Sequence, residues 1–276
     1  MTDVFIRKKP LLEKDTEIVR CINDKMISVT RKIKSYDGRL KNKITKFNFN
    51  GVIDDTQNNN HIFNKFILNN LDDDLTCFMY GQTGSGKTHT VLGEIDDEGI
   101  FIRAGKELME NSDELYISAY QIYNDNIYDL LGNNNKLKIY ENKNHKFKIP
   151  NLTNLSITNM NELYRCVNII IRNRAQSSNN INMTSSRSHA ILIYKYIKDE
   201  SIINIKLIDL AGNERSKNSK IKSLSSRLEN KHINFSLFSL KECIRNIEKG
   251  KRHIPFRRSK LTSVLRFFFI VSFSKG

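Results

Sequence analysis

The 276-residue sequence has no tryptophan, three prolines and only twelve glycines. Twelve glycines cannot form the regular repeat of collagen, and a hydrophobic content of 39% exceeds that of disordered chains. Long hydrophobic runs are also lacking, since Phe267–Val271 is far below the roughly 20 residues of a transmembrane helix. The charged N-terminus has no signal-peptide core. These absences indicate a globular chain without a membrane span, long enough for a sizeable core.

Cysteine is also scarce, and Cys21, Cys77, Cys166 and Cys243 lie far apart in the sequence. They form neither a CxxC pair nor a cluster with histidines. The spacing therefore predicts neither a disulfide scaffold nor a zinc site, and it fits reduced thiols inside a cell better.

Acidic residues are outnumbered, since 45 Lys and Arg residues face 30 Asp and Glu residues and leave a formal net charge of +15. The segment Ser216–Gly276 holds 15 basic and three acidic residues, so twelve of these positive charges lie there. Such asymmetry predicts a polyanionic partner. Nucleic acid, an anionic membrane and an acidic protein surface all satisfy it, and a solvated basic face remains the alternative.

Apolar periodicity predicts strands and helices that alternate along the whole chain, with no Pro/Gly-rich linker between them. Strands are expected at Val4–Arg7, Ile44–Asn50, Leu75–Tyr80, Leu115–Tyr123, His189–Tyr196, Ile202–Asp209 and Phe267–Phe273. Helices are expected at Ile62–Leu68, Leu163–Arg172, Ile233–Ile247 and Ser259–Arg266. The mixture indicates one α/β domain.

A phosphate-binding loop is predicted at Gly81–Thr88, where GQTGSGKT matches the pattern GxxxxGK[ST]. The loop follows the apolar strand Leu75–Tyr80 and precedes a candidate helix, which is the context that this motif requires. Its glycines let backbone N–H groups turn toward phosphates, Lys87 reaches the β- and γ-phosphates, and the Thr88 hydroxyl suits Mg²⁺. A chance match is the alternative, and the strand–loop–helix context argues against it.

Two further motifs narrow the choice among P-loop proteins. Asn182–His189 reads NMTSSRSH, which taken alone is a serine-rich turn before a strand. Asp209–Arg215 reads DLAGNER and directly follows a buried strand, where an aspartate can hold Mg²⁺. The Ala-Gly pair after Asp209 permits close approach of the backbone to a γ-phosphate.

Together the three motifs resemble those of the kinesin motor family, in the same order and at matching spacing. The likeness extends to Arg7–Pro10 (RKKP), Ser118–Leu131 (SAYQIYNDNIYDLL), Ile233–Leu240 (INFSLFSL) and His253–Thr262 (HIPFRRSKLT). The resemblance implies a single P-loop NTPase domain over residues 1–276, with a central, mostly parallel sheet and helices on both faces. It also implies a microtubule-stimulated ATPase that uses ATP and Mg²⁺.

The resemblance assigns roles to individual residues. ATP would be cradled by Gly81, Gln82, Thr83, Gly84, Ser85, Gly86, Lys87 and Thr88, and its adenine flanked by Arg7, Lys9, Pro10 and His89. Thr88 and Ser186 would hold Mg²⁺ directly, and Asp209 through water. The loop that closes on the γ-phosphate would include Asn182 and Ser185, and Gly212 would offer its backbone N–H. Arg187 and Glu214 would form an ion pair, and a water relay to Glu214 is expected; an ordinary surface salt bridge is the alternative.

The resemblance places the partner-binding face on the basic C-terminal segment, and acidic tubulin is the expected partner, with neither nucleic acid nor a membrane. The candidates are Lys241, Arg245, Lys249, Lys251, Arg252, Arg257, Arg258 and Lys260. Arg258 stands where the family pattern has an acidic residue, and Phe235 replaces a lysine. The expected location is the microtubule cytoskeleton of the cytoplasm, including the spindle.

Within the family, Leu240–Arg245 (LKECIR) is similar to the kinesin-13 group, which depolymerises microtubule ends. The Lys-Val-Asp loop tip of depolymerases is missing from Arg39–Phe47. The final helix and neck linker have no counterpart, and no coiled-coil heptads occur, so the oligomeric state stays open. Two alternatives remain: a reduced kinesin-like module that binds microtubules with little ATP turnover, and a basic P-loop protein acting on nucleic acid.

Overall fold

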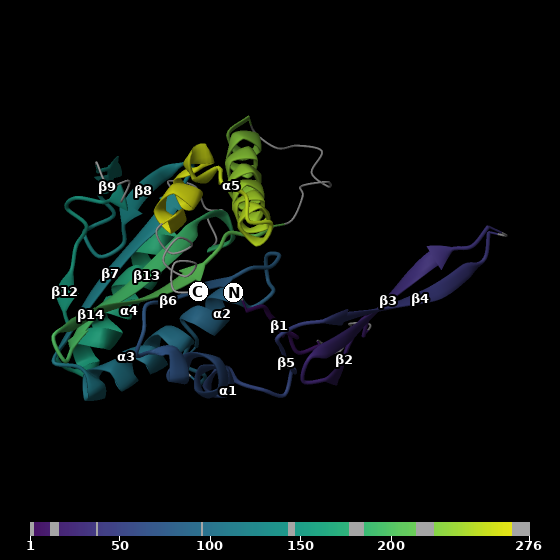
Figure 1. Ribbon diagram of the computed structural model, residues 1–276, viewed down its shortest axis with the longest axis horizontal. Helices are drawn as coiled ribbons and strands as arrows, with labels where there is room; N and C mark the ends of the chain where they lie inside the picture. Colours follow the sequence, from purple (N-terminus) through teal and green to yellow (C-terminus); the bar gives the residue numbers. More distant parts are fainter. Residues whose placement is uncertain are drawn as a thin grey trace. The chain divides into compact units, whose positions relative to one another are not determined.

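The computed structural model describes residues 3–11, 17–36, 38–94, 96–142, 147–176, 185–213 and 224–266. The chain divides into two compact units, Met1–Ile62 and Phe63–Gly276. Each unit has its own sheet structure (Figure 1). Within the described ranges, we find no helix that is both long and apolar enough to cross a membrane.

The first unit contains a three-stranded antiparallel sheet in the order β2-β3-β4 (Val19–Asn23, Met26–Lys34 and Leu40–Asn48). A parallel pair joins β1 (Phe5–Arg7) to β5 (Gly51–Ile53), and a helical turn, α1 (Asn59–Ile62), ends the unit. The sequence pattern predicted β1 and part of β4 but missed β2 and β3. Most β3 and β4 side chains are partly or fully exposed, so apolar alternation is weak there.

The second unit is built on a seven-stranded sheet. Its order is β6-β14-β13-β7-β8-β9, with β12 also paired to β7. These strands are β6 (Leu75–Met79), β7 (Glu114–Tyr123), β8 (Asn126–Asp129), β9 (Lys136–Leu137), β12 (Leu155–Ser156), β13 (His189–Lys198) and β14 (Ser201–Asp209). A short antiparallel pair, β10 (Tyr140–Glu141) with β11 (Phe147–Lys148), lies outside this sheet.

The α/β fold class is confirmed, but the direction of the strands needs a correction. Among the described strands of this sheet, β6 pairs with β14 in parallel, whereas the other pairs are antiparallel. The hairpin of β13 and β14 accounts for one antiparallel pair, because strands joined by the tight turn at Asp199–Glu200 must run in opposite directions. The sheet is therefore mixed rather than mostly parallel.

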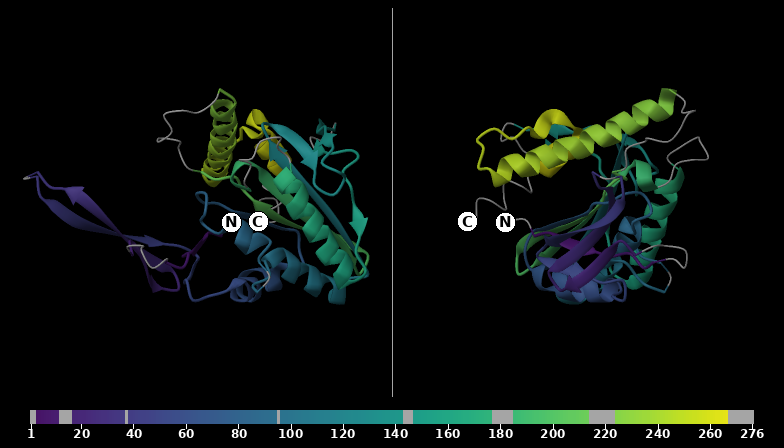
Figure 2. Two further views of the ribbon diagram at one scale, coloured as in Figure 1. Left: turned by 180° about the vertical axis from the view of Figure 1, so that it is seen from behind. Right: turned by 90° about the vertical axis from the view of Figure 1, so that its right-hand side faces the viewer.

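Helices cover both faces of this sheet (Figure 2). One face carries α3 (Ile100–Asn111) and α4 (Met160–Gln176), and the other carries α5 (Leu224–Glu248) and the helical residues 260–266. Shorter helical turns are η1 (Phe63–Ile67), η2 (Leu68–Asn70), α2 (Lys87–Val91), η3 (Ser185–Arg187) and η4 (Phe256–Arg258). The expected helices are confirmed, and α5 begins nine residues earlier than the pattern indicated. The strand expected at Phe267–Phe273 lies outside the described residues.

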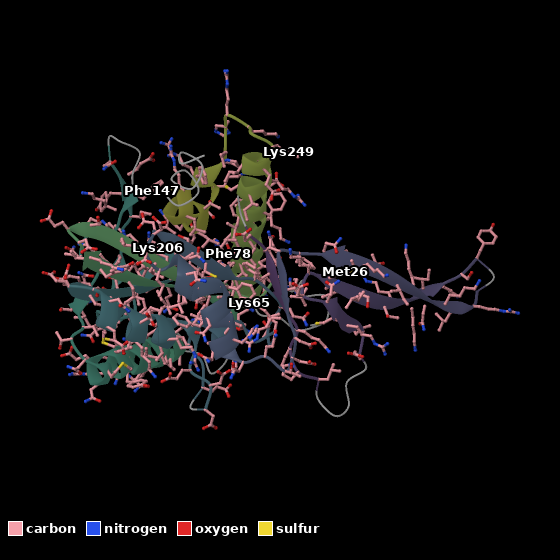
Figure 3. All side chains as sticks on the ribbon, turned by 60° about the horizontal axis from the view of Figure 1, so that its bottom comes forward. Met26, Lys65, Phe78, Phe147, Lys206 and Lys249 are labelled. Atoms are coloured by element: carbon pink, nitrogen blue, oxygen red, sulfur yellow. The ribbon has the colours of Figure 1, made fainter. Side chains whose placement is uncertain are left out.

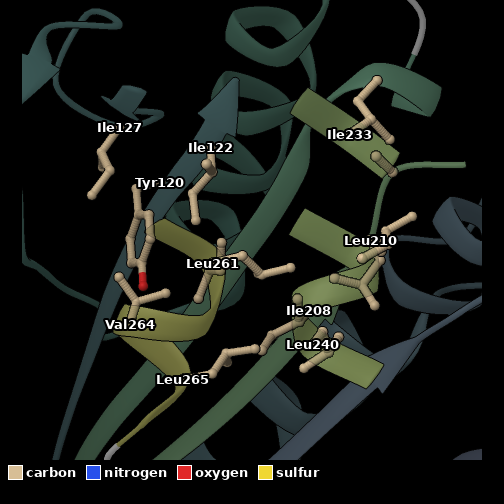
Figure 4. Close-up of a cluster of buried hydrophobic side chains, with 13 residues drawn as sticks. Tyr120, Ile122, Ile127, Ile208, Leu210, Ile233, Leu240, Leu261, Val264 and Leu265 are labelled. Atoms are coloured by element: carbon tan, nitrogen blue, oxygen red, sulfur yellow. The ribbon is translucent and has the colours of Figure 1, made fainter. Parts of the chain in front are cut away.

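Successive side chains of β13 point to opposite faces of the sheet, and apolar residues on both faces pack against helices. Tyr194 points toward α3, stacks on Phe101 with ring centroids 4.3 Å apart, and donates a hydrogen bond to the Phe101 carbonyl. Ile191 lies on the opposite face, in a cluster with Ile208, Leu240 and other apolar residues from α5 and residues 260–266 (Figure 4). A strand buried on both sides is mostly apolar, and the buried end of β14 before Asp209 is apolar except for Lys206.

Candidate functional site

The P-loop connects β6 to α2, as the sequence predicted. Gly84 and Gly86 have φ values of 76° and 88°, in the left-handed region where a side chain is strained. Lys87 begins α2, and its Nζ donates hydrogen bonds to the carbonyl oxygens of Gly81 and Gln82, each at 2.9 Å. The lysine therefore folds back over its own loop, at the place where phosphates would compete with these carbonyls for the ammonium group.

Asp209 ends β14 and lies beside the P-loop, because β14 pairs in parallel with β6 and Asp209 is opposite Met79. The Thr88 hydroxyl donates to Asp209 Oδ2 at 2.5 Å. Asp209 is 1% exposed, and its other oxygen, Oδ1, has no hydrogen-bond partner among the described residues. A threonine hydroxyl and a carboxylate with an open oxygen are the hard ligands that Mg²⁺ prefers, so this pair fits the ion.

Arg174, in the last turn of α4, also contacts Asp209, a contact that the sequence pattern did not predict. Its Nη1 lies 2.5 Å from Asp209 Oδ2, and its Nη2 donates to the Ser188 carbonyl at 3.1 Å. Both charged side chains are almost completely buried. An arginine at the end of an amphipathic helix gives no signal of such a role, because α4 and β14 meet only in the folded chain.

Backbone hydrogen bonds join the three motifs. The Gly212 N–H donates to the Ser186 carbonyl at 2.8 Å, and the Asn213 N–H donates to the Gly81 carbonyl at 3.3 Å. The Gly212 N–H that was expected at a γ-phosphate is therefore engaged by Ser186 here. Asn182 and Glu214 lie outside the described residues, and for Ser185 only the backbone, in η3, is described.

The partner of Arg187 in this structure is Glu229 of α5, at 3.0 Å. Glu214, the expected partner, lies outside the described residues, so that expectation stays a prediction. The Glu229 side chain is 6% exposed, and its charge acts with burial to raise the pKa of the nearby Tyr123 hydroxyl, burial having the larger effect. This ion pair connects η3 of the NMTSSRSH motif to α5.

His189, at the start of β13, forms a second link between the NMTSSRSH motif and α5, and this link is buried. The Ala211 N–H donates to its Nδ1 at 3.1 Å, and its Nε2 lies 2.8 Å from Ser236 Oγ on α5. Because Nδ1 accepts this hydrogen bond, the ring proton is on Nε2, which donates to Ser236 Oγ. The Ser236 hydroxyl in turn donates to the Ile233 carbonyl. Burial, assisted by the positive charges of Arg174 and Lys87, lowers the pKa of His189 to about 3, so the ring is neutral.

The residues expected around adenine belong to both units. In the first unit Arg7 Nη1 donates to Asn59 Oδ1 at 2.7 Å, and Lys9 and Pro10 are exposed. In the second unit His89 Nε2 lies 3.8 Å from Asp97 Oδ2.

Several basic residues expected to bind a partner also have partners within the chain. Lys241 Nζ lies 5.1 Å from the ring centroid of Tyr80, Arg245 pairs with Glu242, and Arg257 forms two hydrogen bonds with Glu141. The remaining exposed members of the set are Lys249, Lys251, Arg252 and Arg258, and Figure 3 labels Lys249. Lys260 is partly buried, and its backbone N–H donates to Asp125.

Three features define a P-loop nucleotide-binding domain: a P-loop, a carboxylate at the end of the neighbouring parallel strand, and backbone hydrogen bonds that join the segment after this carboxylate to the P-loop and to Ser186. The model of the kinesin motor domain matches residues 7–272. The chain therefore belongs to the kinesin motor domain family.

The curated relatives include kinesin-like protein KIF24 of Homo sapiens, which is 36% identical over 206 residues, 71% of this chain and 15% of that protein. KIF24 of Mus musculus matches with the same identity and coverage. This chain thus spans a small part of these relatives.

Two solved structures share the fold. A fast kinesin, described with implications for its ATPase mechanism and interactions with microtubules, has a TM-score of 0.81 at 26% identity, covering 96% of this chain and 80% of that one. A structure of kinesin 6 has a TM-score of 0.75 at 19% identity, covering 97% of this chain and 90% of that one, and supports the fold alone.

Proposed function

We propose that this motor domain binds ATP with Mg²⁺ and hydrolyses it to ADP and phosphate, and that microtubules stimulate the reaction. The observation that carries the proposal is the contact between Thr88 Oγ1 and Asp209 Oδ2, beside a buried Oδ1 with no partner among the described residues. Thr88 and Ser186 would hold Mg²⁺ directly and Asp209 through water. The bound ion would supply positive charge to the β- and γ-phosphates.

Hydrolysis of this kind depends on positioning and charge more than on covalent chemistry. Lys87 would exchange its two carbonyl partners for phosphate oxygens, which bind an ammonium group more strongly. The Gly212 N–H would leave Ser186 and face the γ-phosphate. Arg187 would leave Glu229 for Glu214, and Glu214 would accept the proton of the attacking water through a water relay.

Phosphate release with and without microtubules tests this activity. We expect Asp209→Asn to lose most of the turnover, because the amide weakens the Mg²⁺ site. Asp72→Asn is the matched control, since Asp72 is an exposed aspartate that pairs with Lys198 on the surface. Equal turnover of Asp209→Asn and the wild type would contradict the assigned role.

The proposed filament partner rests on the excess of positive charge and on family membership. Exposed charges interact over about 8–10 Å before salt screens them, so binding to microtubules should weaken steeply with added salt. Cosedimentation at increasing salt measures this dependence. Salt-insensitive binding would argue against the basic face, and competition by single-stranded DNA would favour a nucleic-acid partner.

The finer proposal is that the domain shortens microtubule ends, in the cytoplasmic or spindle cytoskeleton. It rests on the similarity of Leu240–Arg245 to the kinesin-13 group, and this segment lies within α5. Stabilised microtubules observed with the protein and ATP would shorten. Gliding would identify a walking motor instead, and binding without turnover would identify the reduced module.

A further inference from the structure

The hairpin of β3 and β4, in the first unit, takes no part in the roles assigned above (Figure 1). β2 pairs with β3 only at Met26–Val29, and one backbone hydrogen bond from Thr30 to Ile18 extends that contact. Beyond Thr30, β3 pairs with β4 alone among the described strands. We call residues 31–44 the distal hairpin. Because a two-stranded hairpin is at best marginally stable in water, a surface that covers one of its faces would stabilise it.

The distal hairpin is strongly basic. Residues 31–44 contain six basic residues and one acidic residue, which gives a formal net charge of +5. Arg31 lies directly opposite Lys43 in the strand register, and like charges at opposite positions destabilise a hairpin. Five exposed side chains of this segment have no ion pair or hydrogen bond among the described residues: Arg31, Lys32, Lys34, Lys41 and Lys43. An anionic surface would relieve this repulsion.

Large apolar side chains are exposed on one face of the distal hairpin. Leu40 is 70% exposed and Ile44 is 63% exposed. Both project from the same face of β4, because side chains four residues apart in a strand point the same way. Tyr36, in the connection between the two strands, is fully exposed. Exposure of these groups to water is unfavourable, and contact with hydrocarbon would remove that cost.

Two lysines share the face that carries these aliphatic groups. Lys34 lies directly opposite Leu40, and opposite residues project from the same face of a sheet. Lys32 is two residues before Lys34 and projects from this face as well. Lysine stems can lie along an apolar layer while their ammonium groups stay in water or at a phosphate. The face therefore combines apolar surface with positive charge, as do segments that lie in a membrane interface.

Three kinds of polyanion fit the charge alone, and the apolar side chains distinguish between them. Nucleic acid offers phosphates, and base faces on which Tyr36 can stack, but no aliphatic surface for Leu40 and Ile44. An acidic protein would need an apolar pocket shaped for this face. The interface of an anionic bilayer supplies phosphates directly beside hydrocarbon without a shaped pocket, and tyrosine is enriched at that depth. The bilayer therefore fits this face best.

We propose that the distal hairpin binds peripherally to anionic phospholipid bilayers. Lys32 and Lys34 contact the headgroup phosphates, and Leu40, Ile44 and Tyr36 enter the boundary between headgroups and acyl chains. The open edges of the strands stay at the level of the headgroups, where water and phosphates satisfy their backbone groups. Lipid binding of this kind needs neither ATP nor a filament, so it goes beyond the proposed function and is tested separately from it.

Cosedimentation of the protein with phosphatidylcholine vesicles, with and without phosphatidylserine and in the absence of nucleotide, tests this binding. We expect binding to vesicles that contain phosphatidylserine and at least about tenfold weaker binding to pure phosphatidylcholine. Lys32→Gln/Lys34→Gln should weaken binding roughly thirtyfold, which corresponds to about 1 kcal/mol for each lysine near the surface. The matched control is Lys136→Gln/Lys138→Gln, which removes two exposed lysines at the same spacing on the second unit and should leave the affinity unchanged.

The absence of tryptophan from the chain provides a second readout, which does not depend on affinity. Tyr36→Trp introduces a single tryptophan, whose emission should shift to shorter wavelength on vesicles that contain phosphatidylserine. Ile202→Trp is the matched control, since Ile202 is an exposed aliphatic residue of β14 and its variant should show no shift. Leu40→Ser/Ile44→Ser should weaken vesicle binding at least about tenfold, because two aliphatic side chains no longer enter the interface.

The proposal is overturned if the hairpin variants and the control variants bind vesicles equally, or if the Tyr36→Trp variant shows no shift when vesicles are bound. Equal binding to vesicles with and without phosphatidylserine also overturns it. Polyglutamate and an oligothymidylate are the competing ligands. If either binds more tightly than the vesicles and loses affinity in Lys32→Gln/Lys34→Gln, the hairpin recognises an acidic polypeptide or a nucleic acid, and the proposal is wrong.

Discussion

Replacing Arg174 by methionine would leave Asp209 buried without the guanidinium group that now contacts it. The two side chains are 4% and 1% exposed, and their charged atoms lie 2.5 Å apart. Removing one partner of such a pair costs about 3–5 kcal/mol of unfolding free energy, because an uncompensated charge stays in the interior. Arg174 also donates a hydrogen bond to the Ser188 carbonyl, so we expect a cost near the upper end of this range.

Urea unfolding followed by circular dichroism, without nucleotide or Mg²⁺, measures the cost. Arg172→Met is the control, since Arg172 is exposed on the same helix and should change stability by under about 0.5 kcal/mol. Asp209→Asn added to Arg174→Met should recover about 1–3 kcal/mol, because the amide is neutral. The reasoning is refuted if Arg174→Met costs under about 1 kcal/mol, or if the double variant equals the sum of the single ones.

Three further predictions concern buried groups. Because the pKa of His189 is about 3 in the folded chain, only the unfolded chain protonates this histidine between pH 6.5 and pH 5. Lowering the pH over that range should therefore reduce the free energy of unfolding by about 2 kcal/mol. Urea midpoints should lose that slope in His189→Asn and keep it in His253→Gln, where an exposed histidine is replaced. Burial lowers the pKa of Lys206 to about 8, so the charged form destabilises the fold at pH 7. Lys206→Met should therefore raise the free energy of unfolding at pH 7 by up to about 3 kcal/mol. The increase should be smaller at pH 9, because the wild-type lysine is then mostly neutral in the folded chain. Gly105→Ala places a methyl group against the Tyr194 hydroxyl, and we expect a loss of about 1–3 kcal/mol in thermal or urea unfolding, with an unchanged midpoint contradicting this packing.

Sequence patterns predicted best where an element is mostly apolar. The runs at Leu75–Tyr80 and Ile202–Asp209 correspond to β6, which is partly buried along its length, and β14, whose second half is buried; the two strands build the nucleotide side of the sheet. They failed at β2 and β3, where charged and polar residues replace apolar alternation because those strands are largely exposed. The helix predicted at Ile233–Ile247 is shorter than α5, because the N-terminal part of α5 has a weaker apolar period.

The sequence by itself determined the family and the P-loop, because a phosphate site needs particular residues at fixed local spacing. Thr88 and Asp209 could be named before the fold was known for the same reason. Only the tertiary structure decided that Arg174 neutralises Asp209 and that Arg187 pairs with Glu229. Each of these contacts joins side chains from elements far apart in the chain, and charge attraction has no preferred sequence separation until packing brings the partners together.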